Sequence, residues 1–123
     1  MLARKKILIV DDEPGVRELL TECLAGGGYE IRTAGSGEEA LETAAVFLPD
    51  LILLDLVMPE MDGWGVLAKL YSEPKTRDIP VVVITGRTDT ESLLKPERKQ
   101  TLDYFFKPID LTELRDFIKN HVS

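Results

Sequence analysis

Five residues with reactive or ligating side chains stand at the ends of the most apolar runs in the sequence. They are Asp11 and Asp12 after KILIV, Asp55 after LILL, Thr85 at the end of IPVVVIT, and Lys107 after DYFF. A continuous apolar run closed by a turn signal is typical of a strand that is buried on both faces. Because the carboxyl ends of parallel strands meet at one edge of a sheet, we expect the five side chains to gather at that edge.

Together these side chains have the chemistry of a phosphoryl-transfer site. Three crowded carboxylates repel one another and favour a bound cation, and ligands that are all oxygen favour Mg²⁺ or a similar hard ion such as Mn²⁺. Lys107 and Thr85 offer a positive charge and a hydroxyl to phosphoryl oxygens. Asp55, on the central strand, is placed as the nucleophile that becomes an aspartyl phosphate. Taken singly, Asp55 and Thr85 are also explained as caps and Lys107 as a solvated lysine, so the prediction depends on their joint placement.

The segments that carry these residues alternate between strand and helix patterns. The predicted strands are Lys6–Val10, Tyr29–Thr33, Leu51–Leu54, Ile79–Thr85 and Asp103–Phe106. The predicted helices begin at Pro14, after Ser36, at Trp64, at Asp89 and after Asp110, and the fourth is limited to Asp89–Lys95 by Pro96. Alternation of this kind requires a parallel sheet with right-handed crossovers and helices on both faces.

Apolar residues at helical spacing predict the buried side of each helix. Leu19 and Cys23 belong to the apolar face of the first helix, and Leu48 belongs to that of the second. Cys23 is therefore expected to be a small core residue rather than a reactive thiol. Ser36 and Glu39 have the spacing of a capping box at the start of the second helix.

Length and charge restrict the possible functions. The chain has 123 residues, enough for one domain with its own core. Its net charge of −7 argues against direct binding to nucleic acid or to an anionic membrane. Residues 86–123 hold equal numbers of acidic and basic side chains, which suits the docking of a partner. A single cysteine fits a reducing, cytoplasmic location, and neither a signal peptide nor a transmembrane segment is recognisable.

The sequence resembles the receiver domain of bacterial two-component response regulators, and its length is similar to that of chemotaxis response regulators. The resemblance covers essentially the whole chain, as a single receiver domain over residues 1–123 without an output domain. The matching motifs are Asp11-Asp12, Asp55 with Met58-Pro59 and Asp62-Gly63, Thr85, and Lys107-Pro108. The resemblance implies an α/β, flavodoxin-like, doubly wound fold, with a five-stranded parallel sheet of order 2-1-3-4-5 and five helices.

The same resemblance implies a role for each site residue. Asp55 would accept a phosphoryl group from the phosphohistidine of a histidine kinase or phosphotransfer protein, without acting as a turnover enzyme on a separate substrate. Asp12, Asp55 and the backbone carbonyl of Val57 would ligate Mg²⁺ or Mn²⁺ directly, whereas Asp11 would act through water. Lys107 would pair with the phosphoryl group.

Thr85 and Tyr104 would form the conformational switch of the family. On phosphorylation, the Thr85 hydroxyl would move toward the new oxygen and Tyr104 would turn inward. This movement would change the surface of the predicted fourth helix, fifth strand and fifth helix. That surface would contact a downstream effector domain or protein, or a second copy of the chain in a phosphorylation-dependent homodimer.

Val57 departs from the family pattern, in which this position often carries a polar side chain. Because an apolar side chain cannot orient an attacking water, we predict slow self-dephosphorylation. Other classes of protein stay open as alternatives. A flavodoxin would bind FMN phosphate beside Asp11-Asp12-Glu13, which would repel it. A haloacid-dehalogenase-like phosphatase needs an Asp at position 57. The main alternative is a pseudo-receiver that binds partners without phosphorylation, although such domains usually lack one of the acids, the Thr or the Lys.

Overall fold

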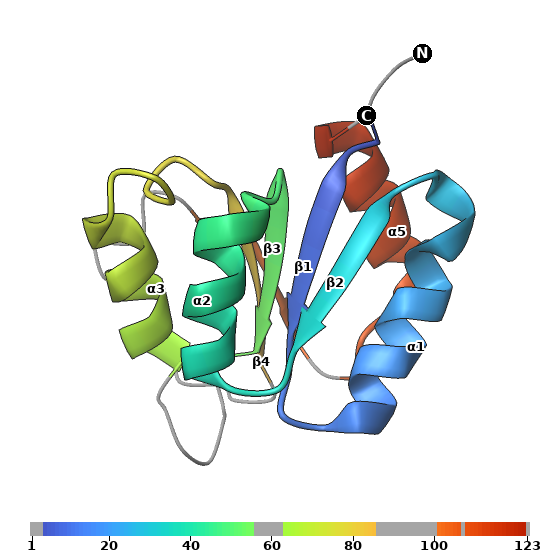
Figure 1. The fold of residues 1–123 in the computed structure, drawn as a ribbon. Helices are drawn as coiled ribbons and strands as arrows, with labels where there is room; N and C mark the ends of the chain where they lie inside the picture. The colour runs from blue at the N-terminus through green and yellow to red at the C-terminus, as the bar shows by residue number, and fades with distance from the viewer. Residues whose placement is uncertain (1–3, 56–62, 86–100, 107, 123) are drawn as a thin grey trace.

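Five strands form one parallel sheet with α-helices on both faces in the computed structural model of the chain (Figure 1). The structure describes residues 4–55, 63–85, 101–106 and 108–122. The strands, in chain order, are β1 (Lys6–Val10), β2 (Glu30–Ala34), β3 (Leu51–Asp55), β4 (Val81–Thr85) and β5 (Thr101–Phe106). The helices in the described residues are α1 (Pro14–Leu24), the short 3₁₀ helix η1 (Ala25–Gly27), α2 (Gly37–Phe47), α3 (Gly63–Ser72) and α5 (Leu111–Val122).

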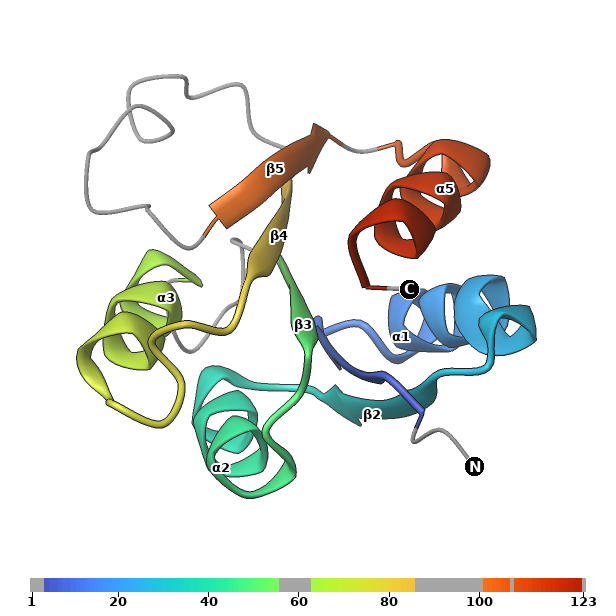
Figure 2. The same ribbon diagram turned by 90° about the horizontal axis from the view of Figure 1, so that it is seen from above.

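The predicted parallel α/β architecture is confirmed. The spatial order of the strands is β2-β1-β3-β4-β5, and every pairing in it is parallel. Seen from above, α2 and α3 cover one face of the sheet, and α1 and α5 cover the other (Figure 2). The predicted helix over Asp89–Lys95 lies outside the described residues, so the five-helix arrangement stays a prediction. None of the helices in the described part of the chain is both long and apolar enough to cross a membrane.

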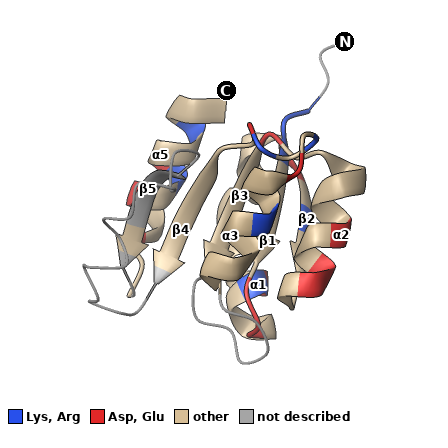
Figure 3. Ribbon diagram, turned by 90° about the vertical axis from the view of Figure 1, so that its left-hand side faces the viewer, with Lys and Arg blue, Asp and Glu red and all other residues tan. Residues whose placement is uncertain are grey.

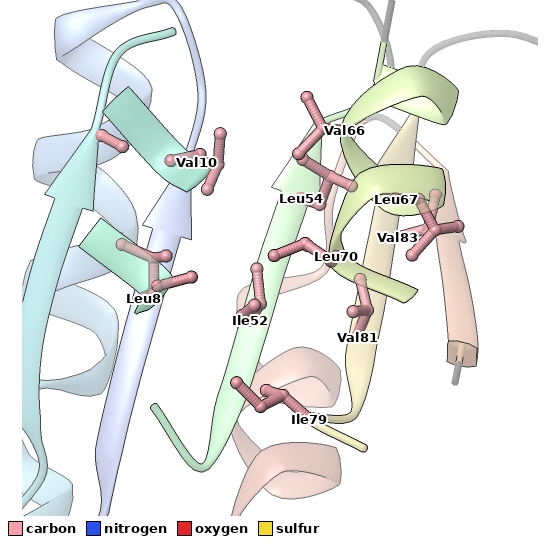
Figure 4. Close-up of a cluster of buried hydrophobic side chains, with 13 residues drawn as sticks. Leu8, Val10, Ile52, Leu54, Val66, Leu67, Leu70, Ile79, Val81 and Val83 are labelled. Atoms are coloured by element: carbon pink, nitrogen blue, oxygen red, sulfur yellow. The ribbon is translucent and has the colours of Figure 1, made fainter. Parts of the chain in front are cut away.

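The three central strands are buried on both faces because each lies between two other strands and two layers of helices. Alternate residues of β1, β3 and β4 pack against α2 and α3, and Figure 4 shows this side of the core: Leu8, Val10, Ile52, Leu54, Val81 and Val83, with Val66, Leu67 and Leu70 of α3. The other apolar residues of these strands pack against α1 and α5: Ile7, Ile9, Leu51, Leu53, Val82 and Ile84. The continuous apolar runs in the sequence therefore reflect two core layers that share one sheet.

Three strand boundaries differ from those predicted. β2 is shifted by one residue from the predicted Tyr29–Thr33, and it ends at the buried Ala34. β4 begins at Val81 rather than Ile79, because the Ile79 N–H donates to the Thr76 carbonyl oxygen (3.1 Å) in the preceding turn. β5 begins two residues earlier than predicted. In each case a local hydrogen bond or the pairing with a neighbouring strand, neither visible in the apolar pattern, determines the end of the strand.

The predicted capping box is present at the start of α2. The Ser36 hydroxyl accepts a hydrogen bond from the Glu39 N–H (3.2 Å), and a Glu39 carboxylate oxygen accepts one from the Gly35 N–H (2.6 Å). The return bond reaches Gly35 rather than the cap residue itself. The capping box therefore fixes the β2–α2 connection as well as the first turn of α2.

The predictions that Leu19 and Leu48 are buried are wrong. Leu19 is 48% exposed, because Leu20 and Leu24 supply the buried side of α1. α2 ends at the buried Phe47, and Leu48 is its C-cap residue, with φ 49°, ψ 64° and 47% exposure. The left-handed turn at Leu48 breaks the helical periodicity, so its side chain points away from the face that the pattern predicts.

This left-handed Leu48 gives a direct test of backbone strain. A left-handed conformation costs a residue with a Cβ roughly 1–2 kcal/mol and costs glycine almost nothing. We expect Leu48→Gly to raise the free energy of unfolding by about 0.5–1 kcal/mol. The gain is smaller than the strain that is removed, because glycine also has more freedom in the unfolded chain, which favours unfolding. Urea denaturation measures the change. Ala45→Gly is the matched control inside α2, where glycine should lower the stability by about 1 kcal/mol. A loss of stability in both variants would contradict the strain at Leu48.

Candidate functional site

Three carboxylates meet at the carboxyl edge of the sheet. One carboxylate oxygen each from Asp11, Asp12 and Asp55 lies within 4.8 Å of the other two. Asp11 and Asp55 are almost fully buried, with 1% and 2% exposure, and Asp12 is half-buried. The sequence prediction that these three acids come together is confirmed.

The sheet register explains this meeting. Val10 of β1 pairs with Leu54 of β3, so the next residues, Asp11 and Asp55, stand at the same level on adjacent strands. Ile9 and Leu53, two residues earlier, face the core layer of α1 and α5. Because side chains alternate along a strand, Asp11 and Asp55 point toward the same side of the sheet. The rigid central strands therefore place both carboxylates, and Asp12 reaches them from the loop that follows β1.

The β1–α1 loop is held by two hydrogen bonds at Asp11, one through its backbone N–H and one through its carboxylate. The Asp11 N–H donates to the Ala34 carbonyl oxygen (3.1 Å), which extends the pairing of β1 with β2. An Asp11 carboxylate oxygen accepts from the Glu13 N–H (2.9 Å), and Pro14 then begins α1. Asp11 therefore has the structural role of a turn-forming aspartate as well as its place in the acidic cluster.

The remaining predicted site residues are only partly described. Thr85 is the last residue of β4, next to β3, and Tyr104 lies within β5, paired with Val83. Thr85 therefore stands at the same carboxyl edge as Asp55, because Ile84 pairs with Asp55. Val57 and Lys107 lie outside the described residues, so their predicted roles stay predictions.

Charged side chains lie at both edges of the sheet. Glu38 and Glu39 lie in the first turn of α2, which starts at the same carboxyl edge as the acidic cluster. Lys5 and Lys6 lie at the opposite edge, where β1 begins, and Asp50 lies there as well, since its carboxylate accepts a hydrogen bond from the Lys6 N–H (2.8 Å). Figure 3 accordingly shows red and blue segments side by side at that edge. Glu38 and Glu39 therefore add negative charge at the edge where the acidic cluster lies.

The donor set fits a hard divalent cation. Three carboxylates, two of them buried, provide only oxygen ligands, which are preferred by Mg²⁺ and Mn²⁺. A zinc or copper site would be expected to use histidine or cysteine. His121 lies at the end of α5, where its Nδ1 is 2.8 Å from the Phe117 carbonyl oxygen. Cys23 lies on α1, with its thiol 3.5 Å from the Leu111 carbonyl oxygen.

Cys23 is half-buried rather than a core residue as predicted, but its thiol has the low reactivity that was expected. Burial raises the pKa of its thiol, and the positive charge of Arg115 offsets this effect only in part. A raised pKa keeps the thiol protonated and less nucleophilic at neutral pH.

Two residues beside the acidic cluster were not singled out from the sequence. Arg17 Nη1 of α1 donates to the Asp11 carbonyl oxygen (2.7 Å). Gly35, after β2, packs so closely against this guanidinium that an added Cβ would lie 2.8 Å from Nη1. The only signal in the sequence is an arginine one to two helical turns after the acidic pair, and such an arginine is ordinarily a solvated helix residue.

Comparison with known proteins decides the family. Residues 7–119 match the family model of the response regulator receiver domain. The chain belongs to this family. The match includes all three acids of the cluster, so the receiver-domain resemblance predicted from the motifs is confirmed.

Relatives and solved structures support the assignment as a receiver domain. The chain is 38% identical over 122 residues to a probable cyclic di-GMP phosphodiesterase of Vibrio cholerae, covering 99% of this chain and 27% of that protein. Chemotaxis protein CheY4 of Vibrio cholerae superposes with a TM-score of 0.88 at 27% identity, covering 98% of this chain and 100% of that one. Response regulator TrrA of Thermotoga maritima, in complex with Mg²⁺-BeF, gives a TM-score of 0.79 at 36% identity, covering 96% and 99%.

The receiver domain spans about a quarter to a half of the length of the curated relatives it matches. These relatives include a DNA-binding response regulator and a regulatory protein. The activities in their names are therefore activities of those full-length proteins.

Proposed function

We propose that this receiver domain is a phosphorylation-dependent signalling switch that accepts a phosphoryl group on Asp55. The observation that supports this most is the meeting of Asp11, Asp12 and Asp55, two of them buried, within 4.8 Å at the carboxyl edge of a parallel sheet. A rigid central strand holds Asp55 at this edge, where ligands of open α/β sheets bind. The domain is proposed to act in the cytoplasm as a phosphoacceptor rather than as a turnover enzyme.

The carboxylates of Asp12 and Asp55, with the backbone carbonyl of Val57, would hold Mg²⁺ or Mn²⁺ directly, and Asp11 would act through water. The fit rests on the all-oxygen donor set of the cluster. When bound, such an ion supplies positive charge that offsets the carboxylates and the incoming phosphoryl oxygens. The solved complex of TrrA with Mg²⁺-BeF supports this proposal by relationship.

The proposed reaction is a transfer from phosphohistidine to aspartate. A carboxylate oxygen of Asp55 attacks phosphorus, the phosphorus–nitrogen bond breaks, and the imidazole of the histidine kinase or phosphotransfer protein takes up a proton. Lys107 pairs with the phosphoryl oxygens, and the Thr85 hydroxyl donates a hydrogen bond to one of them. Confining the nucleophile to a stiff strand reduces the entropy that must be lost before attack.

The output follows from the same switch residues. Thr85 and Tyr104 change position on phosphorylation and alter the proposed surface of the predicted fourth helix (Asp89–Lys95), β5 and α5. An effector domain or protein, or a second phosphorylated copy of the chain, reads that surface. Neither nucleic acid nor a membrane is proposed as a direct partner of this acidic domain.

Intact mass spectrometry after incubation with acetyl phosphate and Mg²⁺ tests the proposal. The wild type should gain one phosphoryl group, Asp55→Asn should gain none, and EDTA should prevent the gain. Asp116→Asn, which removes an exposed carboxylate on α5, should react like the wild type. A folded wild type that binds Mg²⁺ but gains no phosphoryl group would overturn the switch and favour the pseudo-receiver alternative.

Val57 leads to a separate prediction about the lifetime of the phosphorylated state. Its apolar side chain cannot position water for attack on the aspartyl phosphate. We expect Val57→Asn to shorten the lifetime severalfold at an unchanged rate of phosphorylation. The decay of the phosphorylated mass after removal of acetyl phosphate measures the effect, with Val57→Ile as the apolar control. Equal lifetimes of the wild type and the asparagine variant would contradict the prediction.

A further inference from the structure

We propose that Arg17 is a positioning residue for the metal site, and that Gly35 provides the space that its guanidinium requires. The proposal rests on the proposed function, because it concerns the geometry of the acids that would bind Mg²⁺. The observation behind it is the hydrogen bond of 2.7 Å from Arg17 Nη1 to the carbonyl oxygen of Asp11.

This hydrogen bond fixes the peptide group between the two loop acids. The carbonyl of Asp11 and the N–H of Asp12 belong to one rigid plane. The Asp11 N–H is already held by the Ala34 carbonyl oxygen (3.1 Å), so Arg17 fixes the other side of the same residue. Once this plane is fixed, the backbone direction at Asp12 is fixed as well. Arg17 therefore determines how the half-buried Asp12 approaches the buried Asp55, although its described hydrogen bond goes to a backbone carbonyl and not to either carboxylate.

Arg17 acts on the backbone and is not simply paired with an acid. In the described part of the chain, the one ion pair within 4.0 Å joins Arg32 and Glu30 and does not include Arg17. Arg17 is half-buried, and the described contact of its guanidinium in the loop is with a carbonyl oxygen. A charged donor to a carbonyl forms a stronger and shorter bond than a neutral donor does, which suits a fixed loop.

Gly35 completes the arrangement from the β2 side. An added Cβ would lie 2.8 Å from Arg17 Nη1 and 3.3 Å from Arg17 Cζ, closer than such atoms normally approach. The backbone at Gly35 cannot easily withdraw, because its N–H is held by the Glu39 carboxylate (2.6 Å). The flexible guanidinium would therefore be the group that moves. Gly35→Ala should displace Arg17 from the Asp11 carbonyl without any change to Arg17 itself.

The experiment measures the Mg²⁺ dissociation constant of the whole chain by titration calorimetry. Changes to residues that orient metal ligands typically cost 10–100-fold in affinity, and we expect about tenfold weaker binding for Arg17→Met and for Gly35→Ala. Arg17→Lys keeps a charged donor and should fall between the wild type and Arg17→Met. Gly15→Ala is the matched control, because an added Cβ there meets nothing within 4 Å.

The double variant makes the test specific. If Gly35→Ala acts by moving Arg17, it should add no further loss of affinity when Arg17 is already Met. Circular dichroism at the titration temperature checks that every variant is folded, so that a loss of stability alone would not change the dissociation constant. Binding as in the wild type by both single variants, or fully additive losses in the double variant, would overturn the positioning role.

Asp12→Asn separates this inference from the proposed function. A wild type that binds Mg²⁺ and loses binding on Asp12→Asn would support the metal site, whatever Arg17→Met does. A wild type that binds no Mg²⁺ would overturn both the metal site and the role of Arg17.

Discussion

In metal-free buffer, Asp55→Asn is expected to raise the free energy of unfolding by about 1–2 kcal/mol. The Asp55 carboxylate is 2% exposed, and one of its oxygens lies within 4.8 Å of the carboxylates of Asp11 and Asp12. Two like charges about 5 Å apart repel by on the order of 3 kcal/mol at an effective dielectric constant of about 20. The expected gain is smaller than this repulsion, because Asp12 is half-buried and screened by solvent. Asp55 also has a further interaction in the folded chain, which an amide would replace imperfectly.

In saturating Mg²⁺, the wild type is expected to be more stable than Asp55→Asn, the reverse of the order in metal-free buffer. A ligand that binds only the folded state stabilises it by about 2.7 kcal/mol at a concentration one hundred times its dissociation constant. The wild type should receive this stabilisation, whereas Asp55→Asn, which lacks one proposed ligand, should lose most of it. Urea denaturation in EDTA and in saturating Mg²⁺ measures the four free energies of unfolding.

The control for this comparison is Asp116→Asn, which changes the net charge equally on the exposed side of α5. Its stability should stay close to that of the wild type in both buffers, with a full Mg²⁺ effect. An Asp55→Asn variant that is less stable than the wild type in EDTA would show that repulsion in the cluster is not the dominant energy. If Mg²⁺ stabilised the wild type and Asp55→Asn equally, the ion would have to bind at another place.

The meeting of the acidic residues could be predicted from the sequence, whereas the contacts around them could not. Asp11 and Asp55 directly follow apolar runs whose burial is set by the two core layers, so the register of parallel strands brings them together. The meeting therefore depends on period-two alternation and strand length, which the sequence carries locally. Arg17 and Gly35 contribute through a contact between α1 and the end of β2. Such a contact depends on how far a flexible side chain reaches, which no periodicity encodes.

The fold shows the same division between local pattern and tertiary contact. The central strands were predictable because β3 is buried at every residue from Leu51 to Asp55. The prediction for Leu48 fails because α2 ends one residue earlier, in a left-handed turn. The prediction for Leu19 fails because the buried side of α1 is narrower than its set of apolar residues: Leu20 and Leu24 are buried, whereas Leu19 is exposed. Helical spacing predicts the direction of a side chain only while the helix continues and only where another element covers it.

Leu53→Ala is expected to lower the free energy of unfolding by about 3–4 kcal/mol, a large part of the 5–15 kcal/mol typical of a domain. Leu53 is fully buried on β3, in the core layer that packs against α1 and α5. Its neighbours Ile9 and Val82 lie on adjacent strands that are fixed by hydrogen bonds on both sides, so the cavity left by the missing atoms cannot collapse. The loss therefore includes a cavity energy as well as the transfer energy of the removed groups.

Leu19→Ala is the matched control, because the same atoms are removed from a side chain that is 48% exposed. It should cost less than about 1 kcal/mol, since solvent already covers half of that side chain. Urea denaturation with unchanged m-values measures both losses. Equal losses at the two positions would contradict the two-layer core. Although Leu53 lies on the same side of β3 as Asp55, it has no part in the proposed chemistry. Leu53→Ala should therefore still take up a phosphoryl group while it is folded, which separates the stability of the strand from the chemistry at its end.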